Sequence, residues 1–254
     1  MNATIIIALN TFKENIRNKV LYNILLFALG IILLSISFGD WSVFARVQVM
    51  EDFGLATMSI AGLLLAVFIG VGLLGKEISQ KTLYTVLVRP VNRFQFILGK
   101  FTGLLVTLFI NFGIMTLVFS AVLVYQGGTI ELPLLSAVFL AWVELAVIVS
   151  VSILFSVFTT PTLAAIFTIA FWIIGHYNDL VQIKDVQADS PAFALLLKAI
   201  YYVLPNLEHF NIRAPVIYGN GIEPGFVVLA VIYGLLYTTL FLLLATLVFS
   251  RKDV

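Results

Sequence analysis

A single acidic side chain, Glu144, lies inside the long apolar stretch from Leu134 to Phe158. A carboxylate inside an apolar segment of this length is costly, and it usually faces a protein interior or water. Two interpretations are open: Glu144 lines a path across a membrane or titrates during a cycle, or it is protonated and hydrogen-bonded to a neighbouring helix. Asn111, in the preceding apolar stretch, is a candidate partner or part of the same polar lining, with simple helix–helix hydrogen bonding as the alternative.

Other residues that could do chemistry do not form a recognisable catalytic or metal-binding pattern. The two histidines, His176 and His209, form no HExxH pair, and the sequence has no cysteine. His176 beside Tyr177 is interpreted as an anchor at a membrane interface, with metal binding as the alternative. We therefore expect no catalytic residue, no metal site and no bound cofactor on this chain.

A glycine-rich stretch mimics two nucleotide-binding motifs. Gly70 to Gly75 fits G-x-G-x-x-G, and Gly70 to Lys76 fits the first seven positions of a P-loop. The first motif needs a preceding strand, whereas here an apolar run precedes it, and Glu77 stands where a P-loop needs Ser or Thr for magnesium. Nucleotide binding by this chain is therefore not expected. The spacing of Gly62, Ala66 and Gly70 instead predicts a small-residue ridge on which helices approach closely.

Membrane helices are the elements that must position these residues. Apolar side chains make up 61% of the 254 residues and charged ones 11%, which is too little polar surface for a soluble globule. Six runs approach or exceed the roughly 20 residues that a bilayer-spanning helix needs, the fifth being the shortest. They are Val20 to Phe38, Leu55 to Leu74, Phe101 to Tyr125, Leu134 to Phe158, Thr162 to Tyr177 and Phe226 to Phe249. We predict an all-α integral membrane protein with one domain, residues 1–254.

Three segments outside these runs are also predicted to be helical. Residues 1–19 carry Ile5, Leu9, Phe12 and Ile16 at helical spacing with polar residues between them, which is typical of an amphipathic helix lying in a membrane interface. A short interfacial helix is expected from Asp40 to Phe53. Within the outer segment, residues 178–224, a helix is expected to start at Ser190-Pro191 and to end before Pro205.

The distribution of charge predicts the topology. If the N-terminus lies inside, the inner pieces hold ten basic and three acidic residues, whereas the outer pieces hold four basic and nine acidic residues. Basic residues favour the cytoplasmic side of a membrane. We therefore predict six spans with both termini in the cytoplasm, in a cell inner or plasma membrane.

Five of the fourteen basic residues lie between Lys76 and Lys100, a polar loop between two apolar runs. Glu77 and Lys81 stand four residues apart, which supports a helix, and Arg89 before Pro90 marks its end. Such a helix exposes Leu83 and Leu87 to a partner. The alternative is a solvated anchor loop with no partner.

This loop resembles the cytoplasmic coupling loop of the permease subunits of type-2 ABC transporters. The residues that carry the resemblance are Glu77, Thr82, Leu87, Pro90, Arg93, Gly99 and Lys100. Two positions depart from the family pattern: Lys81 stands where Gly is common and Asn92 where Ser is common. The resemblance implies a coupling helix, residues 77–88 within the loop 76–93, that docks on a separate nucleotide-binding subunit, and a helical outer segment between the last two spans.

From the resemblance we expect the ATPase-coupling residues to be Glu77, Lys81, Thr82, Leu83, Tyr84, Leu87, Arg89, Pro90 and Arg93. ATP and Mg²⁺ are expected on ATPase partner subunits, and one coupling loop per chain implies a second copy or a related permease. Membrane lipid is the other expected partner, whereas nucleic acid is not expected. The expected function is a permease that forms the translocation path, with export as the direction. A non-transporting membrane scaffold or assembly subunit is the alternative, and an intramembrane enzyme has no reactive cluster to support it.

Overall fold

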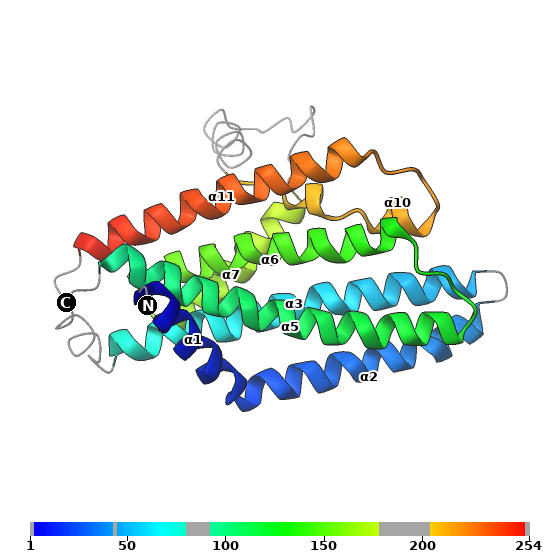
Figure 1. Cartoon of the computed structure of the whole chain (residues 1–254), viewed down its shortest axis with the longest axis horizontal. Helices are drawn as coiled ribbons and strands as arrows, with labels where there is room; N and C mark the ends of the chain where they lie inside the picture. The colour runs from blue at the N-terminus through cyan, green and yellow to red at the C-terminus, as the bar shows by residue number, and fades with distance from the viewer. Residues whose placement is uncertain (1–2, 43–44, 80–91, 178–203, 252–254) are drawn as a thin grey trace, which may run out of the picture.

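The computed structural model describes residues 3–42, 45–79, 92–177 and 204–251, and for residues 73–79 it describes the backbone alone. Every element within these ranges is a helix. In chain order they are α1 (Ala3–Ile16), α2 (Lys19–Trp41), α3 (Arg46–Ser79), α5 (Arg93–Tyr125), α6 (Leu132–Phe158), α7 (Pro161–His176), the 3₁₀ helix η1 (Leu207–Phe210), α10 (Arg213–Ile217) and α11 (Pro224–Arg251). The long helices lie side by side in one elongated bundle (Figure 1).

Five of these helices are long and apolar enough to cross a membrane: α2, α3, α5, α6 and α11. This indicates a multi-pass membrane protein with an all-helical fold. The fifth predicted span, Thr162 to Tyr177, corresponds to α7, which has 16 residues and is a shorter apolar helix. The count of six membrane spans therefore stays a prediction.

The prediction of a separate interfacial helix from Asp40 to Phe53 is wrong. Helix α2 continues through Asp40 to Trp41, and α3 starts at Arg46 and runs without interruption into its apolar part. The charged residues are accommodated at the helix ends, where Arg46 forms an ion pair with Asp40. Polar residues at the end of a span therefore extended the membrane helix instead of starting a new one.

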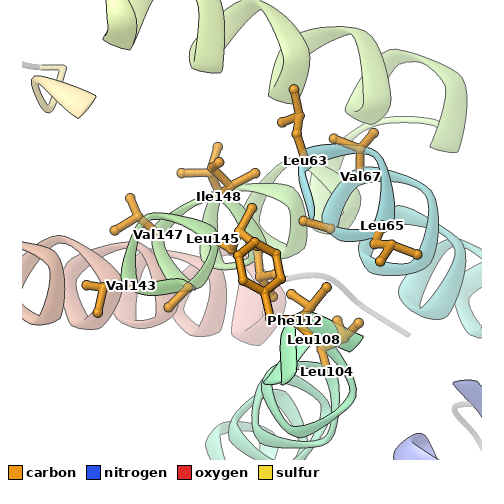
Figure 2. Packing of buried hydrophobic residues seen from close by; sticks show 14 of the residues in the cluster. Leu63, Leu65, Val67, Leu104, Leu108, Phe112, Val143, Leu145, Val147 and Ile148 are labelled. Carbon is orange, nitrogen blue, oxygen red and sulfur yellow. The ribbon is translucent and has the colours of Figure 1, made fainter. Parts of the chain in front are cut away.

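Helices α3 and α6 form the centre of the bundle, and α2 and α11 are its most exposed long helices. In α6 every residue from Val143 to Ile153 is buried, because α3, α5, α7 and α11 all pack on it. Figure 2 shows the middle of this core, where Phe112 of α5 reaches toward Leu145 of α6 beside leucines of α3. The one acidic residue of this stretch, Glu144, is therefore enclosed by helices on several sides.

The start of α1 and the end of α11 lie at the same end of the bundle, which we call the termini end (Figure 1). At the opposite end, α10 and the connection between α5 and α6 lie together (Figure 1). The region after His176 returns at residue 204, and η1 packs on α6 and α7 while α10 packs on α3 and α6. Part of the predicted outer segment thus folds onto the bundle, while its predicted helix after Pro191 lies almost entirely outside the described residues.

Candidate functional site

Glu144 is buried in the middle of α6, with only 5% of its surface exposed. Its Oε1 atom accepts a hydrogen bond of 2.9 Å from the indole Nε1 of Trp172. The same oxygen lies 3.7 Å from Nε2 of His176. A buried carboxylate needs such partners because water cannot solvate it there. The two side chains that supply them come from α7.

Trp172 and His176 are four residues apart on α7, so they project from the same face of the helix. Their rings lie 4.7 Å apart between centroids, and Nδ1 of His176 is 3.3 Å from the carbonyl oxygen of Trp172. Because a carbonyl oxygen only accepts hydrogen bonds, this contact favours a hydrogen on Nδ1 and turns Nε2 toward Glu144. The local helix geometry therefore fixes which histidine nitrogen faces the carboxylate.

Glu144, Trp172 and His176 lie near the end of α7, and η1 packs against α7 there. A side chain at Gly175 would collide with Leu207 of η1, and one at Gly234 of α11 would come within 3.1 Å of Phe210. Tyr233 of α11 accepts a hydrogen bond from the backbone of Asn206 at the start of η1. Two glycines thus let the segment after residue 204 approach the bundle closely enough to cover Glu144.

This covering segment brings charge to the cluster. Arg213 and Glu208 both interact electrostatically with Glu144. They are linked through Asn211, whose amide donates to Glu208 at 2.8 Å and whose Oδ1 accepts from Nε of Arg213 at 3.1 Å. We call Glu144, Trp172, His176, Glu208 and Arg213 the central cluster. It joins α6 and α7 to the outer segment through one carboxylate.

A small cavity adjoins Glu144, with a volume of about 20 Å³, which suffices for about one water molecule. Ser59 of α3, Asn211 and Arg213 are among its lining residues. Two larger cavities of about 380 Å³ and 590 Å³ lie at the end of the bundle opposite the termini end, and both are lined by Gln48 and Tyr218. Arg213 lines the small cavity and the 380 Å³ cavity, so the central cluster borders the hollow end of the molecule.

Asn111 has a different partner from the one proposed for it. It is buried on α5, and its amide donates to the carbonyl oxygen of Thr107 one turn earlier. Its Oδ1 has no hydrogen-bond partner within the described part of the chain. Asn111 is thus not the partner of Glu144, whose carboxylate contacts Trp172 and His176 instead.

The predicted coupling residues are only partly described. Lys81, Thr82, Leu83, Tyr84, Leu87, Arg89 and Pro90 lie outside the described residues, and Glu77 lies in the last turns of α3. Arg93 begins α5 and reaches α11, where it donates to the carbonyl oxygen of Phe249 and lies 5.5 Å from the centroid of its ring. The end of the loop is therefore attached to the last turns of the chain.

A second polar group, the termini cluster, lies where α1 packs on α5. It consists of Thr11, Glu14 and Asn15 of α1 with Lys100 and Thr107 of α5. Asn15 donates to Thr107 at 3.1 Å, and the buried Nζ of Lys100 lies 3.8 Å from the half-exposed carboxylate of Glu14. The exposed residues of α1 include Ile5, Leu9 and Ile16, so α1 turns its buried polar residues inward and an apolar stripe outward.

Glycines allow this contact and the packing of α3. A Cβ atom on Gly103 would lie 2.6 Å from the carbonyl oxygen of Ala8, and one on Gly99 would lie 2.8 Å from the side chain of Ile7. On α3, Gly62 faces Leu145 and Phe112, Gly70 faces Ser152, and Ala66 is fully buried. The Gly99-x-x-x-Gly103 spacing is the small-residue signal that sequence reasoning missed.

Sequence reasoning also missed Trp172 and Arg213 and interpreted His176 as an interface anchor. The i, i+4 spacing of Trp172 and His176 on an apolar helix was an available signal. Their pairing with Glu144 depends on the register between α6 and α7, which spacing within one helix does not reveal. Within the described residues, no group of three or more His, Cys, Asp or Glu side chains has metal-site geometry.

The family model described as "Protein of unknown function (DUF2705)" matches residues 47–254. The match runs from the first turn of α3 to the end of the chain and includes every member of the central cluster. A comparison with curated proteins finds no match. Because the family model covers most of its length, this chain belongs to the DUF2705 family.

Proposed function

We propose that this protein is the permease subunit of an ATP-driven ABC transporter, with ATP and Mg²⁺ bound by a separate ATPase subunit. Two observations support the proposal. The loop before α5 resembles the coupling loop of type-2 ABC permeases at seven positions, from Glu77 to Lys100. The bundle has five helices that are long and apolar enough to cross a membrane.

The observation that carries the proposal is the arrangement of the motif residues in the first turns of α5, where the loop ends. Arg93 contacts α11 at Phe249, Gly99 lets α1 approach α5, and Lys100 pairs with Glu14 of α1. Three residues of the motif therefore connect the start of α5 to the first and last helices. A push on the loop by a docked ATPase acts on α1, α5 and α11 together, which is what a coupling element requires.

The charge distribution supports a cytoplasmic location for the termini end, in an inner or plasma membrane. Two ATPase subunits related by a two-fold axis need two coupling loops, so the permease is a dimer of this chain or of this chain with a relative. The cavities at the opposite end then face outward, and the central cluster lies between them and the ATPase. Export is the direction that the resemblance favours.

Affinity purification of the tagged chain from mild detergent, followed by mass spectrometry, tests the proposal. We expect an ATPase that carries a P-loop to co-purify with the wild type. Changing Leu83 and Leu87 to Asp removes two apolar side chains of the predicted coupling helix, so the ATPase should be lost. The matched control is Tyr218→Asp, because Tyr218 is an exposed aromatic residue at the opposite end of the bundle, and it should retain the ATPase.

Two results contradict the proposal in different ways. If the ATPase is retained by the Leu83/Leu87 double variant, the coupling helix is misassigned. If no ATPase accompanies the wild-type protein at all, the permease assignment fails and the scaffold function takes its place.

A further inference from the structure

The contact between Glu144 and His176 has a chemical requirement of its own. Nδ1 of His176 faces the carbonyl oxygen of Trp172, so the hydrogen of a neutral ring belongs on Nδ1 and Nε2 carries a lone pair. That lone pair points to Oε1 of Glu144 at 3.7 Å. An ionised carboxylate and a lone pair at this distance repel each other. One added proton turns the contact into an attraction, whether it resides on the oxygen or on the nitrogen.

The surroundings favour a proton at this position. Glu144 is 5% exposed, so bulk water does not stabilise its charge. His176 is the last residue of α7, where the helix end favours a positive charge, but burial of the ring and the nearby Arg213 oppose that charge, so the carboxylate is the favoured place for the proton. Trp172 donates to the same Oε1 atom and holds the carboxylate in place.

Among the described residues, the charged groups that act on the pair lie on η1 and α10. Arg213 of α10 acts electrostatically on both Glu144 and His176, and Glu208 of η1 acts on Glu144. From α3 and α5, the side chains that line the adjoining cavity are uncharged, and they include Met58, Ser59 and Phe112. Helix α11, which also packs on α6, carries the titratable residues Tyr233 and Tyr237 and no charged residue before Arg251 at its end. A change in the net charge of the pair therefore changes its electrostatic interaction with Arg213 and Glu208, in the segment that covers it.

We propose that Glu144 and His176 form a proton-binding site inside the bundle, in which one proton resides either on Oε1 of Glu144 or on Nε2 of His176, 3.7 Å away. The site takes up or releases this proton as a unit, since each group changes the charge that the other experiences. Trp172 is a positioning residue, because it orients the carboxylate without exchanging a proton. This inference goes beyond the proposed function and does not depend on an ATPase partner.

The chain offers an internal control for the test, since His176 and His209 are its only histidines. The purified full-length protein is labelled with ¹⁵N-histidine in lipid nanodiscs, and the ring nitrogen signals are followed against pH by NMR. His209 is exposed and supplies the reference signal. The infrared band of a protonated carboxylic acid is recorded on the same samples, and Glu144→Gln identifies the part of the band that belongs to Glu144.

We expect the Glu144 band and the His176 signals to change with a common midpoint. In Glu144→Gln the His176 midpoint should shift by about one pH unit or more, which is the threshold for strong coupling, while His209 stays unchanged. If Glu144→Gln does not fold, His176→Asn gives the reciprocal measurement, a shifted midpoint for the Glu144 band.

Trp172→Phe removes the indole N–H and keeps an aromatic ring. It should shift both midpoints together, and separate behaviour of the two groups contradicts a shared proton. The proposal is overturned if His176 titrates like His209 and ignores Glu144→Gln. It is equally overturned if neither the Glu144 band nor the His176 signals change over the pH range in which the protein stays folded.

Discussion

Lys100 in the termini cluster and Glu144 in the central cluster are both buried ionisable side chains, each with 5% exposure, but their partners differ in kind. Lys100 pairs with Glu14, whose side chain is 53% exposed, so the partner's charge reaches water and stays fixed. Glu144 contacts the uncharged indole of Trp172 and a histidine, whose charge changes near neutral pH. The comparison teaches that burial by itself does not distinguish a structural ion pair from a site whose charge can change.

The two clusters also differ in what holds them together. The termini cluster joins two helices, α1 and α5, that approach closely at Gly99 and Gly103, whereas the central cluster joins side chains of four elements, α6, α7, η1 and α10. Four substitutions test these contacts one at a time. The expected loss of unfolding free energy is largest where a side chain would clash with backbone and smallest where an ion pair with a solvated partner is lost.

The largest effect is expected from Gly103→Val. A Cβ atom there would lie 2.6 Å from a backbone oxygen of α1, and a backbone atom cannot move aside as a side chain can. We expect a loss of about 3 kcal/mol in the free energy of unfolding, measured in detergent, and faster tryptic cleavage at Lys13 of α1 and at Arg17, which follows it.

The matched control for this substitution is Gly113→Val on the same helix, where a Cβ atom meets nothing within 4 Å. Equal losses for the two variants would show that the α1–α5 contact does not depend on the close approach at Gly103.

Glu144→Ala is expected to have the second largest effect. It removes the acceptor of the Trp172 N–H group, and an unsatisfied buried donor costs about 1–3 kcal/mol. Glu144→Gln keeps an acceptor oxygen and should cost less than about 1 kcal/mol. Thermal unfolding of both variants in detergent checks the order, and a Gln variant as unstable as the Ala variant would mean that the negative charge itself stabilises the central cluster.

Asn15→Ala tests the neutral part of the termini cluster. It removes the hydrogen bond to Thr107, which is worth about 1 kcal/mol. Asn10→Ala is the control, because Asn10 is an exposed residue of the same helix. Both substitutions gain helix propensity, because Ala favours helix more than Asn, so unfolding free energies that change equally in both variants would show that the bond to α5 adds no measurable stability.

Lys100→Met should have the smallest effect, below about 1 kcal/mol, because it leaves behind a half-exposed carboxylate that water solvates. The methionine chain keeps much of the apolar contact of the lysine stem. The same chemical denaturation measurement applies. A loss above about 3 kcal/mol would place Lys100 among fully buried ion pairs and remove the distinction between the two clusters.

The membrane helices could be predicted from the sequence because continuous apolar runs identify them directly. Val20 to Phe38 and Leu134 to Phe158 lie within α2 and α6 with ends extended by a few residues. The boundary at Asp40 was misjudged, because charged residues at a helix end pair with each other and do not interrupt the helix. That Glu144 would have partners was also predictable, since a lone carboxylate in an apolar run needs them.

The identity of those partners was not predictable. Trp172 is one turn from the end of a short helix, and Arg213 lies in a polar segment after it. Which turn of α7 meets Glu144 depends on the connection between α6 and α7 and on the packing of both helices. Hydropathy reports which faces are apolar, but it does not report the axial register of one helix against another.

The position of α1 also has a consequence for biosynthesis. The hydrogen bond from Asn15 to Thr107 joins residues 92 positions apart, so α1 is synthesised well before its binding surface on α5. Chains grow from the N-terminus at about 5–20 residues per second, which leaves α1 without its partner for several seconds. The predicted location of α1 in a membrane interface would place its exposed Ile5, Leu9 and Ile16 against lipid during that interval, until the insertion of α5 completes the assembly of the termini end.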